Sequence, residues 1–296
     1  DLQSEIRPRL LELGDTIIQA IRAAGDLDDS MMLRRDFVRA VKAPGLSDET
    51  RMALYDALIQ VEFFPSRLDQ ILAVGEIRIG TTGDYAPFSF RRDESFTGID
   101  IDLARDLANS LDVEAVFVPT SWPTLMQDLA GDRFDIGMSG ISRSLERQRV
   151  AYFSMPYHIG GKTPIARCDD KDALDSLEEI DRPGVRVIVN PGGTNERFVR
   201  ERLGQASVRV FDDNRSIFDE IIAGHADVMI TDAIEVRLKS AMHPELCATL
   251  PGETFTYQQK GYLLPRDDVW KEYVNTWLSQ RIADGTVEAI FNRHLQ

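Results

Sequence analysis

A strand, a turn and a helix follow one another in Val185-Arg-Val-Ile-Val-Asn-Pro-Gly-Gly-Thr-Asn-Glu-Arg-Phe198. The apolar, β-branched run 185–189 predicts a buried strand. The Pro-Gly-Gly of 191–193 fits neither a strand ladder nor a helix, so it predicts a turn. Thr194 offers a hydroxyl as an N-cap, and a helix is expected from there through Leu203. Free backbone N–H groups at such a helix start, beside glycines that permit close approach, predict a seat for an anion.

Glu196 lies in the first turn of this predicted helix, where an acid would repel the anion that the turn is suited to hold. Two interpretations stay open. The carboxylate either points outward and complements the helix dipole, as first-turn glutamates commonly do, or it faces the ligand and takes part in proton transfer. The residue type alone does not choose between them.

The chain of 296 residues is long enough for one large domain or two to three ordinary ones. A hydrophobic content of 43% is typical of a globular protein, and no apolar run reaches the roughly 18 residues that span a membrane. The formal net charge of −15 argues against nucleic acid or an anionic membrane as a partner. A small anionic ligand is still compatible, because one local arginine outweighs a distant field that is screened within roughly 10 Å.

Two cysteines, Cys168 and Cys247, lie far apart without a C-x-x-C pattern, and are either buried thiols or one disulfide. The four histidines show no ligand spacing, so we predict no metal and no cofactor. Asp1 is not a translation start, and we therefore expect a processed or trimmed chain.

Residues 1–65 show three short amphipathic helical patterns, which bury little alone and are expected to pack on the main body or on another subunit. From Ser66 onward, predicted strands alternate with predicted helices, which indicates mostly parallel sheets covered by helices. Strands are predicted at 76–81, 113–119, 134–139, 185–189, 207–211, 227–230 and 259–264, with an extended segment at 162–168. Helices are predicted at 98–111, 122–130, 145–150, 194–203 and 216–223 and at the C-terminus. Because the pattern restarts after 168, two α/β units with a cleft between them are expected, with ligands at the carboxyl ends of the strands.

Polar and aromatic residues follow the first two predicted strands. Thr82, Asp84 and Tyr85 come after the first strand, and Trp122 has the equivalent position after the second. Two aromatic side chains at neighbouring strand ends can bracket a ring-shaped ligand. Alternatively, both are core residues at the edge of the sheet.

Two further strand ends carry charged groups. After 134–139, Gly140 exposes backbone, Ser142 supplies a hydroxyl, and Arg147 is able to clamp a carboxylate, although a helical arginine is commonly solvated. Asp232 ends the strand at 227–230 with a carboxylate that faces the same cleft. On residue type alone, Asp232 is better explained as the N-cap of the next helix.

These motifs together resemble the amino-acid-binding proteins of ABC transporters, and within them the periplasmic cyclohexadienyl (prephenate or arogenate) dehydratases. The resemblance covers nearly all of 66–296 and excludes 1–65. It is carried by TTGDYAPFSF (81–90), PTSWPTLM (119–126), FDIGMSGIS (134–142) with LERQR (145–149), VNPGGTNERF (189–198), MITDAIEVRL (229–238), HPELCA (243–248) and YLLPRD (262–267).

The resemblance implies a two-lobed, type II periplasmic-binding-protein-like α/β fold with an all-α extension at 1–65. Lobe one would be 66–164 completed by 262–296, and lobe two would be 165–261. It implies that Arg147 and Ser142 hold a carboxylate, that Asp232 holds an ammonium group, and that Tyr85 and Trp122 sandwich the side chain. The remaining members of the implied binding set are Thr82, Asp84, Gly140, Thr194 and Asn195.

The resemblance also implies a reaction, the dehydration and decarboxylation of prephenate to phenylpyruvate and of arogenate to phenylalanine. It implies that Glu196 is the general acid, which requires a carboxyl protonated near neutral pH and hence a raised pKa. The alternative is an amino-acid-binding protein of an ABC transporter, because the fold alone does not separate enzyme from carrier.

The same resemblance implies an exported, periplasmic chain in which Cys168 and Cys247 form a disulfide. The expected partner is a small-molecule substrate. Residues 1–65 are expected to support packing or a homo-oligomer, and a chorismate mutase segment is the alternative for them, although their arginines and lysine match no mutase pattern.

Overall fold

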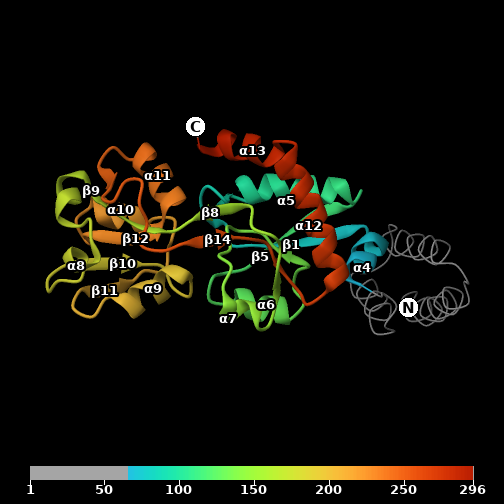
Figure 1. Cartoon of the computed structure of the whole chain (residues 1–296), viewed down its shortest axis with the longest axis horizontal. Helices are drawn as coiled ribbons and strands as arrows, with labels where there is room; N and C mark the ends of the chain where they lie inside the picture. Colours follow the sequence, from blue (N-terminus) through green and yellow to red (C-terminus); the bar gives the residue numbers. More distant parts are fainter. Residues whose placement is uncertain (1–65, 296) are drawn as a thin grey trace, which may run out of the picture.

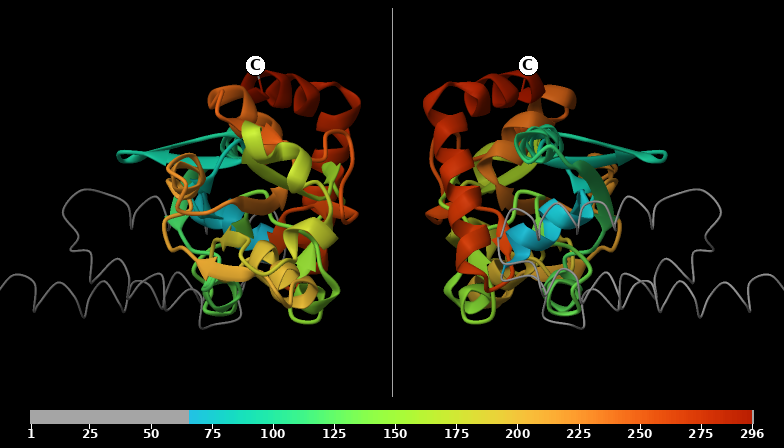
Figure 2. Two further views of the ribbon diagram at one scale, coloured as in Figure 1. Left: turned by 90° about the vertical axis from the view of Figure 1, so that its left-hand side faces the viewer. Right: turned by 90° about the vertical axis from the view of Figure 1, so that its right-hand side faces the viewer.

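The computed structural model describes residues 66–295, and the predictions for residues 1–65 lie outside the described residues. Within that range the chain forms two separate five-stranded sheets with helices packed around them (Figure 1). Figure 2 shows the same arrangement from its two ends. The predicted two-lobed α/β architecture is therefore confirmed.

The first sheet comprises β1 (Glu76–Thr81), β5 (Glu114–Pro119), β6 (Ile136–Gly137), β7 (Tyr152–Phe153) and β15 (Leu263–Leu264), in the order β5-β1-β6-β15-β7. β1 is parallel to β5 and β6, whereas β15 is antiparallel to β6 and β7. Because side chains alternate along a strand, the neighbours Leu263 and Leu264 join different buried clusters on the two faces of the sheet.

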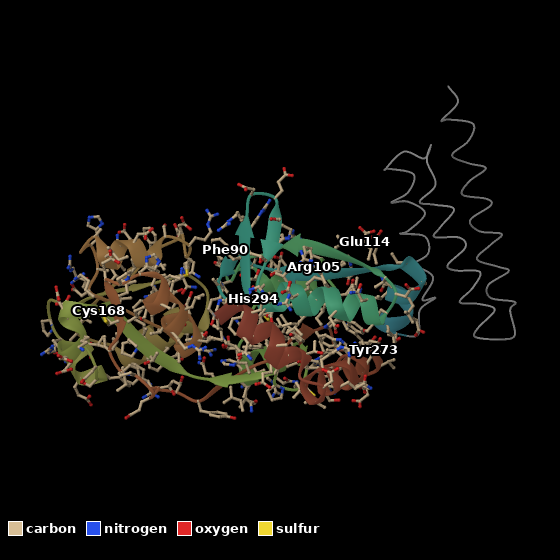
Figure 3. All side chains as sticks on the ribbon, turned by 90° about the horizontal axis from the view of Figure 1, so that it is seen from above. Phe90, Arg105, Glu114, Cys168, Tyr273 and His294 are labelled. Atoms are coloured by element: carbon tan, nitrogen blue, oxygen red, sulfur yellow. A yellow bond between two sulfur atoms is a disulfide. The ribbon has the colours of Figure 1, made fainter. Side chains whose placement is uncertain are left out.

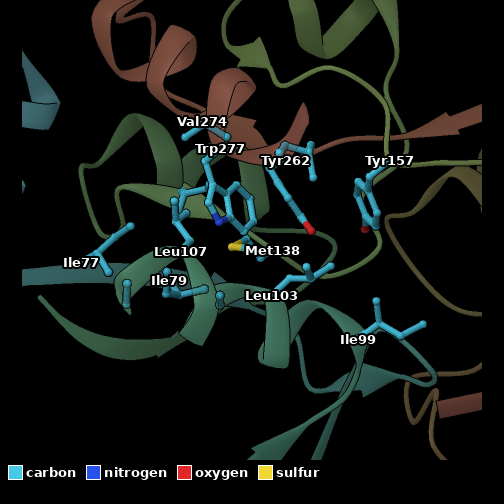
Figure 4. Packing of buried hydrophobic residues seen from close by; sticks show 14 of the residues in the cluster. Ile77, Ile79, Ile99, Leu103, Leu107, Met138, Tyr157, Tyr262, Val274 and Trp277 are labelled. Carbon is cyan, nitrogen blue, oxygen red and sulfur yellow. The ribbon is translucent and has the colours of Figure 1, made fainter. Parts of the chain in front are cut away.

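Helices cover both faces of this sheet. The face that contains Leu264 packs against α4 (Arg67–Val74), α5 (Ile99–Ser110), α12 (Asp268–Ala283) and α13 (Thr286–Leu295). Figure 4 shows this cluster, in which Ile79 of β1 lies with Leu107 of α5 and Trp277 of α12. The opposite face packs against α6 (Leu125–Ala130), and the short α7 (Leu145–Gln148) follows β6.

The second sheet comprises β9 (Lys162–Arg167), β10 (Arg186–Val189), β11 (Ser207–Val210), β12 (Val228–Asp232) and β13 (Leu246–Ala248), in the order β11-β10-β12-β9-β13. Met229 and Ile230 of β12 face opposite sides, as the alternation requires. One side packs against α10 (Ile217–Ile222) and α11 (Ala233–Met242), and the other against α8 (Leu177–Ile180) and α9 (Thr194–Arg202).

Two antiparallel strands, β8 (His158–Gly160) and β14 (Gln258–Lys260), run between the two sheets (Figure 1). β9 pairs with β12 from Lys162 to Ala166, so Lys162 already belongs to the second sheet. The predicted lobe boundary at 164/165 therefore falls inside β9. The other lobe boundaries stay a prediction.

A disulfide joins Cys168, at the start of the 3-10 helix η1 (Cys168–Ala173), to Cys247 in β13. The two Cα atoms lie 4.8 Å apart, within the usual range for a bridge. The predicted disulfide is confirmed, and the bridge fastens η1 to the edge strand of the second sheet.

Several local predictions are wrong in detail. Thr194 is the first residue of α9 rather than its cap, because Gly193 has the N-cap position and no side chain caps this helix. α6 begins at Leu125, so Trp122 lies in the preceding turn. The predicted strand at 259–264 is two strands, β14 and β15. A small sheet made of β2 (Asp84–Tyr85), β3 (Ser89–Arg92) and β4 (Ser95–Thr97) was not predicted.

Candidate functional site

Residues of both lobes enclose a cavity between the two sheets, here named the inner cavity. Its lining residues are Tyr85, Trp122, Gly140, Ser142, Arg147, Asn190, Gly193, Thr194, Asn195, Asn214, Asp232 and Lys260. The free space amounts to only about 20 Å³, little more than one water molecule needs. A ring-sized ligand therefore requires the lobes to move apart before it can enter.

The lining follows from the topology of the two sheets. Tyr85 follows β1 and Ser142 follows β6, while Asn190 follows β10 and Asp232 ends β12. The carboxyl ends of parallel strands meet at one edge of a sheet, and the two lobes turn these edges toward each other. The expectation that ligand residues gather at strand ends is thus met for these positions.

A buried cluster of charges forms the floor of the inner cavity. Asp232, which is 5% exposed, accepts hydrogen bonds from Lys162 Nζ at 2.8 Å and from Lys260 Nζ at 2.6 Å, and a further one from the Tyr85 hydroxyl. Burial opposes the ionisation of Asp232, but the two ammonium groups outweigh it and hold its pKa well below the usual range. Lys260 also donates to Ser142 Oγ at 3.0 Å, which ties the hydroxyl to the cluster.

This arrangement corrects the implied role of Asp232. The carboxylate faces the cavity and has the N-cap position of α11, yet its side chain caps nothing. Because two lysines already neutralise it, Asp232 is not available as the counter-ion of a ligand ammonium group.

Arg147 lies at the other side of the inner cavity. Its guanidinium donates to the Ser142 carbonyl at 3.0 Å, and within residues 66–295 it has no carboxylate partner. Burial and then the nearby Arg197 lower its pKa to about 10, so it stays charged at neutral pH. A half-buried guanidinium without an acid partner is suited to bind a ligand carboxylate, as predicted.

The two aromatic residues do not face each other across a gap. The Tyr85 and Trp122 rings are 5.8 Å apart at 73°, an edge-to-face contact. They form one continuous wall of the inner cavity rather than the predicted sandwich. Burial, followed by Asp232, raises the pKa of Tyr85 well above its usual value, so its hydroxyl keeps its proton.

Three residues of the predicted binding set support the wall or the floor. Thr82 and Asp84 are absent from the lining, and Asp84 instead accepts a hydrogen bond from Trp122 Nε1 at 3.1 Å. Asn214 Nδ2 donates to the Asp84 carbonyl at 3.0 Å, which links the two lobes. Gly140 lines the cavity at a φ of 63°, and a Cβ there would lie 2.6 Å from the Tyr85 ring.

Glu196 lies outside the inner cavity, in a neighbouring groove here named the outer groove. The two spaces share Trp122, Arg147, Gly193 and Thr194. Glu196 accepts the Gly192 backbone N–H at 2.7 Å and pairs with Arg200 at 2.7 Å. The Gly192 N–H first and then Arg200 lower the pKa of Glu196, so it is ionised at neutral pH.

These contacts lower the pKa of Glu196, whereas the predicted acid role requires lobe closure and the substrate carboxylates to raise it, so that role stays a prediction. Its own carboxylate takes one of the turn's N–H groups, which is the place predicted for a ligand anion. In this arrangement the Glu196 carboxylate bridges the Gly192 backbone and the Arg200 side chain.

Glu235 is a second carboxyl group close to the inner cavity, although it does not belong to the lining. It is 1% exposed and lies behind the floor, where Thr231 Oγ1 donates to its Oε2 at 2.6 Å. Thr231 Oγ1 in turn accepts from Asn195 Nδ2 at 3.0 Å, and Asn195 lines the inner cavity. Burial raises the pKa of Glu235 to about 7, so this carboxyl is protonated in part at neutral pH.

Sequence reasoning missed Lys162, Lys260 and Glu235. One signal existed for the lysines, because each is a lone cation at the end of a strand beside glycine, in Gly161-Lys162 and Lys260-Gly261. For Glu235, the signal was an acid beside the apolar Ile234 and Val236 in the helix that follows Asp232. Neither pattern reveals that the three groups converge.

The family model of the bacterial extracellular solute-binding proteins, family 3, matches residues 77–296. The chain belongs to this family. A cyclohexadienyl dehydratase of Pseudomonas aeruginosa is 57% identical over 214 residues, which are 72% of this chain and 80% of that protein. The L-cystine-binding protein TcyJ of Escherichia coli K12 is 28% identical over 227 residues, 75% of this chain and 84% of that protein.

This chain is also similar to a solved structure. The ancestral amino-acid-binding protein AncCDT-1, described as a precursor of cyclohexadienyl dehydratase, is 35% identical with a TM-score of 0.72. The match covers 78% of this chain and all of that one. Among residues 66–295 no helix has the length and apolar character to cross a membrane, and no cluster of three or more metal-binding side chains occurs.

Proposed function

We propose that this protein is a lyase that converts prephenate to phenylpyruvate, with arogenate as a second substrate. The observation that carries the proposal is the charge of the closed site. Arg147 and Lys260 line the inner cavity and Lys162 pairs with Asp232 from behind, while Asp232 is the one acid in the lining, so cationic groups outnumber acidic ones there. Prephenate carries two carboxylates, and its charge therefore complements the site. The similarity to a dehydratase at 57% identity supports the same reaction.

The reaction needs a proton for a poor leaving group. Prephenate loses its ring hydroxyl and its ring carboxylate, and the electrons of the broken carbon–carbon bond complete an aromatic ring. A proton given to the departing oxygen turns hydroxide into water, so the products are phenylpyruvate, carbon dioxide and water. General acid catalysis of this kind typically contributes roughly 10²- to 10⁴-fold in rate.

We assign the proton to Glu235 rather than to Glu196. Glu235 is protonated in part at neutral pH, whereas Glu196 is held ionised at the outer groove. Glu235 lies three residues after Asp232 and accepts a hydrogen bond from Thr231. Thr231 in turn accepts one from Asn195, which lines the inner cavity. Delivery of the proton requires the carboxyl to turn from Thr231 toward the cavity when the lobes close on substrate.

The other side chains of the inner cavity bind and orient the substrate. Arg147 and Ser142 hold one carboxylate, while Lys260 is available to the second from the floor of the inner cavity. The departing carboxylate is expected against the Tyr85 and Trp122 rings, because decarboxylation spreads its charge into the ring. An ammonium group finds no free acid at Asp232, so we expect arogenate to react with a lower kcat/KM than prephenate.

The alternative is a carrier for an amino acid, which the wider family includes. Purified full chain is incubated with prephenate, and released phenylpyruvate is measured beside Glu235→Gln and Glu196→Gln variants. Glu235→Gln should lower kcat by roughly 100-fold or more, and Glu196→Gln should lower it far less. Absence of turnover with tight amino-acid binding would support the carrier, and the reverse order of the variants would restore Glu196 as the acid.

The location of the protein is part of the proposal. The family is extracellular, and a disulfide between Cys168 and Cys247 persists in oxidising compartments. We infer export to the periplasm. A homo-oligomer formed through residues 1–65 stays a prediction, since it falls outside the described residues.

A further inference from the structure

A second cavity lies between the lobes, on the side of the small sheet β2–β4, and is here named the lobe groove. One wall comes from the small sheet and the start of α5, and the other from α10 and α11. Its lining residues are Ala86, Pro87, Phe90, Arg92, Thr97, Gly98, Arg215, Phe218, Asp219, Leu238, Lys239, Met242, His243 and His294. Figure 3 shows Phe90 and His294 where the small sheet and the C-terminal helix approach the second lobe. The free space is about 360 Å³, in the range of small-molecule sites.

Lys239 is the unusual member of this lining. It is 8% exposed, and its Nζ lies 4.7 Å from the centre of the Phe218 ring. Within residues 66–295 its ammonium group makes no ion pair and no hydrogen bond, whereas the buried Lys162 and Lys260 both pair with Asp232. A buried cation without a direct ion pair is costly, and neither the ring contact nor the more distant Glu235 supplies such a pair. A carboxylate would supply it.

The other lining residues of the lobe groove indicate the chemical character of the rest of the ligand. Phe90, Phe218, Leu238 and Met242 offer an apolar surface, and Asp219 is the one acid in the lining. The lining also contains Arg92, which has no carboxylate partner among the described residues. The surface thus combines apolar area with excess positive charge, in a protein whose total charge is −15.

We propose that the lobe groove is a second binding site, which takes a small carboxylate with an apolar or aromatic body and places that carboxylate on Lys239. The ligand contacts both lobes at once, because Phe90 belongs to the first and Lys239 to the second. It therefore binds the closed arrangement of the lobes better than an open one, and favours closure.

The site is also coupled to the reaction, a consequence that rests on the proposed function. Lys239 follows Glu235 by one turn of α11. Burial and Asp232 raise the pKa of Glu235, whereas Thr231, Lys239 and Lys162 act in the opposite direction. A carboxylate bound at Lys239 offsets its positive charge, which favours the protonated form of Glu235. Occupancy of the lobe groove should therefore extend activity to higher pH.

The test measures binding without turnover. The probe is 3-phenylpropionate, titrated calorimetrically into the full chain, with uncharged 3-phenylpropanol for comparison. Lys239→Met should weaken binding of the acid by roughly ten- to a hundredfold, the value of a lost hydrogen bond to a charged group. Lys271→Met is the matched control, because Lys271 lies 4.6 Å over the Tyr152 ring away from the groove. It should leave binding unchanged.

Two further variants complete the test. Arg147→Met removes the predicted anchor of the inner cavity, and the probe should still bind this variant. Met242→Glu adds a carboxylate at an exposed position of the groove, 59% accessible, and should weaken binding even if Lys239→Met fails to fold. The proposal is refuted if the probe does not bind at millimolar concentration, if binding is lost in Arg147→Met alone, or if Met242→Glu leaves it unchanged. None of these readouts requires the protein to be a dehydratase.

Discussion

The pH dependence of catalysis separates the two candidate acids. The structure gives Glu235 a pKa of about 7, and gives Glu196 a pKa below its usual value of 4.5. If Glu235 is the acid, the active fraction is about 0.9 at pH 6 and about 0.1 at pH 8, so kcat/KM should fall about tenfold over this interval. If Glu196 were the acid in this environment, its lowered pKa would keep it ionised over the whole interval, and the profile would show no decline near pH 7.

The pH dependence of kcat should differ from that of kcat/KM. The dependence of kcat/KM reports the pKa of the free enzyme, while that of kcat reports the complex with substrate. Substrate carboxylates bring negative charge close to Glu235, and this raises its pKa. The midpoint for kcat should therefore lie at higher pH than the midpoint for kcat/KM. Burial lowers the pKa of Lys162 to about 8, which adds a second decline above that pH.

The assay measures phenylpyruvate released from prephenate between about pH 5.5 and 9 at constant ionic strength. This interval extends about one to two pH units on either side of the expected midpoint. A sample without enzyme at each pH corrects for spontaneous aromatisation, which acid accelerates. A kcat/KM that stays flat from pH 6 to 8 would refute the assignment. So would a Glu235→Gln variant that keeps the decline near pH 7 with its activity intact.

Three further predictions concern the frame of the site. Asp232→Asn leaves two buried lysines without their acid and should lower the free energy of unfolding by roughly 3–5 kcal/mol in a denaturant titration; a loss under about 1 kcal/mol would contradict the charge cluster. Gly192→Ala places a Cβ 2.7 Å from the Pro123 backbone of the facing lobe, at a φ of 74°. It should impede closure, seen as a raised KM and a larger scattering radius with substrate, and an unchanged KM would exclude this contact as a closing surface. Changing Cys168 and Cys247 to Ser should cost roughly 2–5 kcal/mol of stability, and an unaltered melting temperature under non-reducing conditions would show that the bridge is dispensable.

The architecture was readable from the sequence because local periodicity determines it. The apolar alternation of 76–81 and the strand, turn and helix of 185–203 appear where the pattern predicts them. The strand-end positions of Tyr85, Ser142 and Asp232 were predictable for the same reason, since parallel sheets expose one edge to ligands. Thr82 and Asp84 lie at the same edge, yet point into support contacts, and the order of residues along the chain does not encode this difference.

Long-range charge pairing was not readable. Lys162 and Lys260 meet at Asp232 only because β9, β12 and β14 converge between the lobes. That meeting changes Asp232 from a partner for an ammonium group into the neutralised centre of a cationic floor. A pairing of this kind depends on distances in space, for which one sequence carries no direct signal.

Glu196 and Glu235 show what local sequence determines and what only the tertiary structure decides. Each is an acid in the first turn of a helix, and each has a cation one turn later, Arg200 or Lys239. Local sequence therefore predicts the same behaviour for both. The tertiary structure leaves Glu196 at an open groove, where it accepts the Gly192 N–H, and buries Glu235 behind the floor of the cavity. Water and hydrogen bonds favour the charged form of the first carboxyl, and loss of water favours the proton on the second.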